Sequence, residues 1–90
     1  MKNYEILKKV KELKDEGYYT ATCIEEKATG RVGTAKLAGE DIWVELHDED
    51  DEMDEDFVSA EEFERDYEII EVIIDDGEDD KHYTAEEFLA

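Results

Sequence analysis

The stretch VSAEEFERDYEIIEVIID (residues 58–75) decides the fold, because it joins a helix-start signal to an apolar strand. Ser59 and Glu62 have the spacing of a capping box, in which the N-cap hydroxyl and the third helical carboxylate each accept a backbone amide of the other residue. Val58 and Phe63 stand where a hydrophobic staple places its two apolar side chains. The second half of the stretch has apolar residues on both faces, which is typical of a well-covered strand.

A second copy of this signal closes the chain, in YTAEEFLA (residues 83–90). Thr84 and Glu87 repeat the capping box, and Tyr83 and Phe88 repeat the staple. The repetition predicts one or two short capped helices in the acidic half of the chain.

The first of these helices has one apolar side and one acidic side. Phe63 and Tyr67 are four residues apart, a spacing that places both rings on the buried side of a helix. The remaining positions predict that three glutamates line the exposed side: Glu61, Glu64 and Glu68.

The N-terminal segment NYEILKKVKELKDEG (residues 3–17) predicts an amphipathic helix, because its apolar residues recur at steps of three and four. Asn3 is the expected N-cap and Gly17 the expected stop. We expect the lysines of this helix to face solvent, or to lie beside the acidic half of the chain and partly neutralise it.

Three strands are predicted between the helices, in YYTATCIEE (18–26), VGTAKLA (32–38) and DIWVELHD (41–48), separated by turn residues. Alternation in the last strand places Ile42, Val44 and Leu46 on one face and Trp43, Glu45 and His47 on the other. With the strand at 67–75, the sequence predicts one α+β domain over residues 1–90. It has an N-terminal amphipathic helix, an antiparallel sheet of about four strands and one or two short capped helices.

Composition supports a folded chain with an unusual charge. Thirty Asp and Glu against ten Lys and Arg give a net charge of -20, yet 10% of the residues are aromatic and β-branched residues are frequent, unlike a disordered chain. Residues 1–40 carry eight basic and seven acidic side chains, whereas residues 41–90 carry two basic and twenty-three acidic ones. A charge of this size destabilises a compact domain by self-repulsion, which points to a function for the acidic half.

The single cysteine, Cys23, forms no internal disulfide, and this fits a reducing compartment. The sequence has neither an apolar run of membrane-spanning length nor a signal-peptide pattern at its start. We therefore expect a cytoplasmic protein, located in the host cytoplasm if a phage encodes it.

The candidate partner-binding surface is the set of carboxylates in the acidic half. It consists of the run around DEDDEMDED (48–56), the glutamates of the first capped helix and a second run at 75–80: Asp48, Glu49, Asp50, Asp51, Glu52, Asp54, Glu55, Asp56, Glu61, Glu64, Glu68, Asp75, Asp76, Glu78, Asp79 and Asp80. An extended chain rises about 3.3 Å per residue, close to the roughly 3.4 Å axial spacing of phosphates along one DNA strand. Extended acids therefore reproduce the charge density of a nucleic-acid backbone. The alternative is a solvated loop that serves only solubility.

Two other functions receive less support from the residues. The segment from Asp76 to Glu87 resembles an EF-hand loop, with Glu78 and Asp80 at its third and fifth positions, but Lys81 replaces the glycine of the sharp turn. We keep a calcium site there as an alternative. Ser59, Cys23, His47 and His82 belong to no catalytic or metal-ligand spacing, so we expect no enzyme, no metal and no cofactor.

In length, acidity, lack of a catalytic motif and small α+β build, the chain resembles the DNA-mimic inhibitors that phages direct against CRISPR effectors and restriction enzymes. The resemblance implies an anti-CRISPR or anti-restriction protein whose acids occupy the DNA-binding cleft of a basic nuclease. In a Cas9-type effector the target would be the arginines that read the short motif next to the guide-paired sequence. The implied partner is the DNA-binding protein, with no direct contact to nucleic acid or a membrane. A general acidic module for another basic partner is the alternative.

Overall fold

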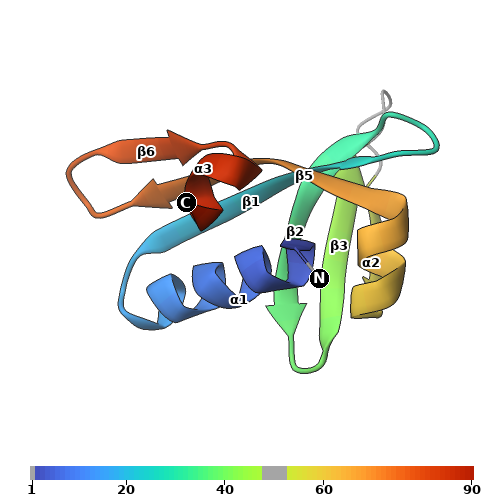
Figure 1. Ribbon diagram of the computed structural model, residues 1–90, viewed down its shortest axis with the longest axis horizontal. Helices are drawn as coiled ribbons and strands as arrows, with labels where there is room; N and C mark the ends of the chain where they lie inside the picture. Colours follow the sequence, from blue (N-terminus) through green and yellow to red (C-terminus); the bar gives the residue numbers. More distant parts are fainter. Residues whose placement is uncertain (1, 48–52) are drawn as a thin grey trace.

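A computed structural model describes residues 2–47 and 53–90 of the chain. The elements in these residues are α1 (Lys2–Asp15), β1 (Tyr19–Glu26), β2 (Val32–Ala38), β3 (Asp41–His47), β4 (Met53–Val58), α2 (Ala60–Asp66), β5 (Tyr67–Asp75), β6 (Asp80–Tyr83) and α3 (Ala85–Leu89). The strands form one antiparallel sheet in the order β4-β3-β2-β1-β5-β6 (Figure 1). The predicted α+β class, the first helix and both short helices are confirmed.

The prediction of about four strands was wrong, since the sheet has six. The expected strands are β1, β2, β3 and β5, and they occupy the four inner positions. The two further strands, β4 (MDEDFV) and β6 (DKHY), are its edges and are rich in charged residues, so their sequences lack the apolar alternation that identifies a strand. Charged side chains are a common protection of edge strands against pairing with another molecule.

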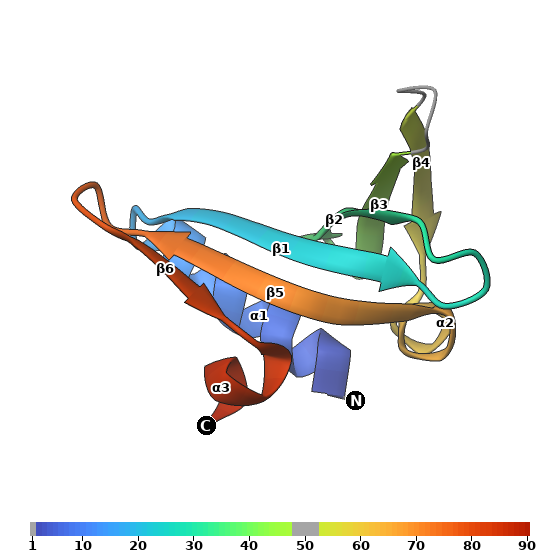
Figure 2. The same ribbon diagram turned by 90° about the horizontal axis from the view of Figure 1, so that it is seen from above.

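The helices cover one face of the sheet and build the core with it. α1 and α3 lie on the same side of β1, β5 and β6 (Figure 2), and α2 lies at the start of β5. Alternate strand residues such as Ile24, Val44 and Val72 point into this layer and are almost completely buried, together with Ile6 and Phe63 from the helices. The predicted split of β3 is confirmed, because Ile42, Val44 and Leu46 are buried and their neighbours are not.

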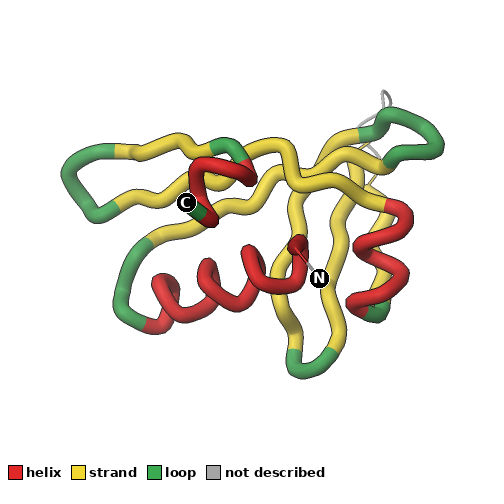
Figure 3. Tube along the Cα trace, in the orientation of Figure 1, coloured by secondary structure: helices red, strands yellow, loops and turns green. Residues whose placement is uncertain are grey.

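β1 and β2 diverge after a short paired segment. Residues 23–25 of β1 pair with residues 32–34 of β2, and beyond this segment the two strands separate. The rest of β1 pairs only with β5, and the rest of β2 pairs only with β3. As a result β2 and β3 cross the long direction of β1 and β5 at a steep angle (Figure 3). Gly33 lies in this corner, where an added Cβ would stand 1.8 Å from the carbonyl oxygen of Glu45, so the two backbones approach as closely as only glycine permits.

The ends of α1 differ in part from the prediction. Gly17 follows the helix with a φ of 106°, as expected of a stop. Asn3, however, lies inside the helix instead of capping it: its side chain is buried and donates from Nδ2 to the carbonyl oxygen of Tyr67, 3.2 Å away. The Asn3 backbone amide donates to Oε2 of Glu64 at 3.0 Å, so a glutamate of the next helix satisfies the start of α1.

The two capped starts form as expected, one of them completely. In α3 the Thr84 hydroxyl accepts from the Glu87 amide, and the Glu87 carboxylate accepts from the Thr84 amide. In α2 the hydroxyl of Ser59 accepts from the Glu62 amide, which is the first half of the box. The Tyr83 and Phe88 rings, with centroids 5.8 Å apart, form the staple of α3.

Candidate binding surface on the open face of the sheet

The face of the sheet turned away from the helices is called the open face here. The strand residues that alternate with the core on this face include seven carboxylates: Glu25, Glu45, Glu55, Glu68, Glu71, Asp75 and Asp80. Cys23, Thr34, Lys36, Trp43 and Phe57 lie among them, and uncharged residues such as Ala21, Val32 and Ile73 complete the face. This face is therefore the first candidate for the binding surface.

Three pairs of carboxylates oppose one another directly across neighbouring strands. Glu45 of β3 faces Glu55 of β4. Glu25 of β1 faces Glu68 of β5, and Asp75 of β5 faces Asp80 of β6. Residues opposed in this way have Cβ atoms about 5 Å apart, and like charges at that distance destabilise the sheet.

One transverse row connects the two acidic parts of the open face. It runs by register from Glu55 to Glu45, then across Thr34 and Cys23, and ends at Glu71. Neighbouring strands are about 4.8 Å apart, so the three strand steps between Glu45 and Glu71 correspond to about 14 Å. The small, uncharged side chains of Thr34 and Cys23 lie between the two carboxylate groups.

Few cations on the described strands offset these acids. Lys36 lies over the ring of Trp43, with Nζ 4.4 Å from its centroid, and that ring stacks on Phe57 at 5.8 Å. His82 of β6 places Nδ1 2.8 Å from Oε1 of Glu71. The open face thus combines carboxylate pairs with an aromatic pair whose outer ring, Phe57, is 61% exposed.

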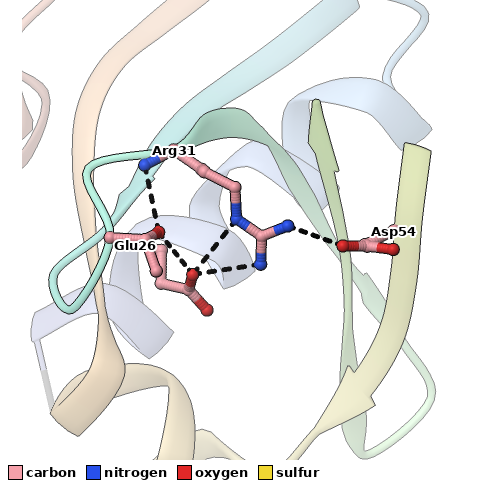
Figure 4. A network of polar contacts seen from close by, with 4 residues as sticks. Glu26, Arg31 and Asp54 are labelled. Atoms are coloured by element: carbon pink, nitrogen blue, oxygen red, sulfur yellow. Dashed lines mark hydrogen bonds and ion pairs between the residues drawn. The ribbon is translucent and has the colours of Figure 1, made fainter. Parts of the chain in front are cut away.

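The acids of β4 divide between the two sides of the sheet. Glu55 is on the open face, whereas Asp54 and Asp56 point to the other side by register, opposite Leu46 and Val44. Asp54 accepts from the guanidinium of Arg31 at 2.6 Å, and Arg31 also donates to Oε1 of Glu26 from Nη2 and Nε (Figure 4). These two carboxylates raise the pKa of Arg31.

The acidic turn between β5 and β6 is held by its own side chains. Asp75 accepts from the Gly77 amide at 2.7 Å, and Asp76 accepts from the amides of Glu78 and Asp79, both at 3.0 Å. The bonds from these amides, with Asp79 contributing most, lower the pKa of Asp76. Glu78 and Asp79 are exposed, and Gly77 has a φ of 97°, so the turn is a compact anionic loop.

The same segment lacks the helix–loop–helix form of an EF-hand. Asp76 to Glu87 consists of a hairpin turn, strand β6 and the start of α3, and the Glu87 carboxylate is used by the cap of that helix. Within residues 2–47 and 53–90, no group of three or more His, Cys, Asp or Glu side chains is placed to hold a metal ion.

The glutamates expected on the exposed side of α2 do not form one surface. Glu61 is exposed on the helix. Glu64 is half-buried and accepts from the Asn3 amide, so the prediction that it faces solvent was wrong. The helix ends at Asp66, and Glu68 therefore belongs to β5, where it faces Glu25. Phe63 and Tyr67 are both buried, as expected, although Tyr67 is the first residue of β5 and not part of the helix. Their rings stack at a centroid distance of 5.5 Å.

Part of the predicted surface lies outside the described residues, namely Asp48, Glu49, Asp50, Asp51 and Glu52. The described acids of the two runs lie on or beside the opposite edges of one sheet. Sequence reasoning missed three members of the open face, Glu25, Glu45 and Glu71, because they lie in predicted strands and outside the dense acidic runs. The period of two in those strands was the signal that would have found them.

Cys23 lies on the open face at the centre of the transverse row. Its side chain is half-buried, and its Cα partners are Thr34 and Glu71. Burial, and to a smaller extent the charge of Glu71, raise the pKa of the Cys23 thiol. A thiol held in its protonated form is a poor nucleophile.

No protein-family model, curated protein or solved structure matches this chain. None of the helices in the described residues has the length and apolar character needed to cross a membrane.

Proposed function

We propose that this chain is a non-enzymatic acidic DNA mimic that occupies the DNA-binding cleft of a host defence nuclease, such as a Cas9-type CRISPR effector. The observation that carries the proposal is the set of three opposed carboxylate pairs on the open face of the sheet. A sheet selected for stability alone would place a basic or neutral residue in one position of each pair.

The opposed pairs favour a basic partner that contacts both members at once. An arginine guanidinium presents two parallel N–H donors to a carboxylate, and a single cation near two opposed carboxylates removes their mutual repulsion. Binding of a basic partner therefore removes an electrostatic repulsion that destabilises the free protein. DNA-binding clefts are lined with such side chains, because they neutralise phosphates.

The dimensions of the molecule support the same partner. Its longest extent is 33 Å, and one turn of duplex DNA is about 34 Å. Within the transverse row, Glu45 and Glu71 are separated by three strand steps, about 14 Å along the sheet, compared with a major groove about 12 Å wide. Two acidic bands separated by a small neutral strip therefore have the spacing of two phosphate rows.

The test is a competition experiment with a purified Cas9-type effector, loaded with its guide, and with a panel of restriction nucleases. Labelled target duplex is added at two salt concentrations, with and without this protein. We expect displacement of the duplex from at least one nuclease, with an affinity that falls steeply with salt. The variant Glu55→Lys/Glu68→Lys/Asp80→Lys should lose displacement. A control variant, Glu16→Lys/Glu40→Lys/Asp41→Lys, has the same net charge without altering a pair or a predicted binding residue, and should retain displacement.

Other outcomes identify the alternatives. Salt-sensitive binding to a nuclease without displacement of DNA would favour an acidic module for a basic surface outside the cleft. Equal loss of displacement in both variants would mean that total charge, and not the opposed pairs, drives binding. The absence of displacement from every nuclease, by a chain shown to be folded, would overturn the proposal.

A further inference from the structure

A cavity of about 310 Å³ lies where β1 and β2 diverge, on the side of α1. Leu7 and Val10 of α1, together with Ala35 and Leu37 of β2, give it an apolar wall. Its volume is at the lower end of the range for small-molecule sites, about 300 to 1,000 Å³.

Two buried polar atoms on the wall of this cavity have no hydrogen-bond partner within the described residues. They are the hydroxyl oxygen of Thr22 and Nε1 of Trp43. Thr22 is only 2% exposed. Nearly all buried polar groups in proteins are hydrogen-bonded, since an unpaired one costs free energy. The indole N–H is only a donor, whereas a hydroxyl either donates or accepts, so both atoms are satisfied by a ligand that supplies acceptor oxygens.

The charge around the cavity favours an anion. Lys11, Lys14 and Lys36 line it, so three of the ten basic residues of a chain with a net charge of -20 gather at this place. Two acids are also present: Asp15 is paired with Lys11 at 3.4 Å, and Glu45 belongs to the open face. Within residues 2–47 and 53–90, Lys14 and Lys36 form no ion pair, which leaves their charge for a ligand.

From these observations we propose that the fork between β1 and β2 binds a small organic carboxylate. Its apolar body packs on the wall made by α1 and β2. Its carboxylate accepts hydrogen bonds from the Thr22 hydroxyl and the Trp43 indole N–H, and Lys14 and Lys36 balance its charge. The cavity shares Thr34, Lys36, Trp43 and Glu45 with the open face, but ligand binding to it is measured without a nuclease and so is tested separately from the proposed DNA mimicry.

The chain provides its own reporter, since Trp43 is the only tryptophan. In ¹⁵N-labelled full-length protein, a single indole N–H resonance reports on Nε1. We would titrate it with benzoate and hexanoate, and use benzyl alcohol as the neutral probe and inorganic phosphate as the anion without an apolar body. We expect a saturable downfield shift of the indole resonance with a carboxylate, and weak or no binding of the other two probes.

Variants locate the site. Thr22→Val and Lys14→Gln should each weaken carboxylate binding about five- to tenfold, the effect of one lost hydrogen bond or charge contact. Thr22→Ser, which keeps the hydroxyl, should restore binding if Thr22→Val loosens the core. The control Lys8→Gln removes an exposed lysine that does not line the cavity, and should bind like the parent chain.

Three results would overturn the proposal. Benzyl alcohol binding as tightly as benzoate would remove the role of charge, and phosphate binding as tightly would remove the role of the apolar wall. An indole resonance that no carboxylate shifts at saturating concentration would mean that water alone fills the cavity.

Discussion

Relieving the opposed carboxylates should stabilise this protein while weakening its proposed function. The test variant is Glu55→Lys/Glu68→Lys/Asp80→Lys, which replaces one member of each pair and changes the net charge from -20 to -14. We replace these three residues because they are exposed. Of their partners, Glu25 and Glu45 are half-buried and Asp75 accepts the Gly77 amide.

The expected gain in the free energy of unfolding follows from the register of the opposed carboxylates. Two unit charges about 5 Å apart in water repel by about 0.8 kcal/mol, and a lysine converts this repulsion into an attraction of similar size. Screening over a Debye length of about 10 Å and side-chain freedom reduce the gain, so that measured cross-strand pairs contribute about 0.2 to 1 kcal/mol each. Three pairs give about 2 kcal/mol, equivalent to a rise in Tm of roughly 8 to 16 °C for a domain of this size.

The assay is thermal and urea unfolding at low and high NaCl. At low salt the variant should have the higher Tm, and its advantage should shrink at high salt as screening weakens the repulsion in the parent chain. The control Glu16→Lys/Glu40→Lys/Asp41→Lys has the same net charge, but Asp41 faces Ala38 and the other two residues lie in turns. If the control gains as much Tm as the test variant, the stabilisation comes from net charge alone, and the argument from opposed pairs fails.

Three further predictions follow from particular contacts. Gly33→Ala should lower the free energy of unfolding by about 1 to 3 kcal/mol or more, because its Cβ would collide with the backbone of Glu45; unchanged urea unfolding would mean that β2 and β3 separate easily in this corner. Asp76→Ala should lower the Tm more at pH 7 than at pH 3. The pKa of Asp76 is lowered in the folded protein, so its charge gives stability that is present above the unfolded pKa and is lost as the pH falls through the folded pKa. An equal loss of Tm at both pH values would contradict a role for its charge. Alkylation of Cys23 by iodoacetamide should have a pH midpoint above that of a free thiol. Glu71→Gln should lower this midpoint, but by less than unfolding does, because burial is the larger cause of the raised pKa. A midpoint unaffected by Glu71→Gln would show that the two side chains are electrostatically independent.

The inner part of the fold was predictable because local signals and packing agree there. The cap at Ser59, the staple at Tyr83 and Phe88 and the alternation in β3 each predict what forms. The edge strands were not predictable in the same way, since β4 and β6 hold their places through backbone pairing with β3 and β5 while their side chains are mainly polar. A strand that buries few side chains leaves little pattern in its sequence.

The sequence predicted an acidic surface, but only the pairing register of the strands shows which residues belong to the open face. The runs around residues 54–56 and 75–80 showed where charge is dense, yet the sequence does not say which carboxylates share a face. Asp54 is neutralised by Arg31, and Glu64 caps α1, so two expected site residues are used in tertiary structure. Pairing partners far apart in the chain, such as Glu25 and Glu68, become neighbours only through the order of the strands.

The distribution of the ion pairs gives the last argument for a surface selected for binding. Arg31 is placed between two carboxylates, Glu26 and Asp54, on the side of the sheet that faces away from the opposed pairs. Arg65 is used by its neighbour Asp66. The lysine and arginine side chains of the described residues that form ion pairs thus compensate acids outside the open face, where the imidazole of His82 forms a hydrogen bond with Glu71. A chain selected only for solubility gains nothing from leaving three opposed carboxylate pairs uncompensated on one face. A chain that must attract arginine and lysine from a partner loses affinity with each of its own cations placed on that face.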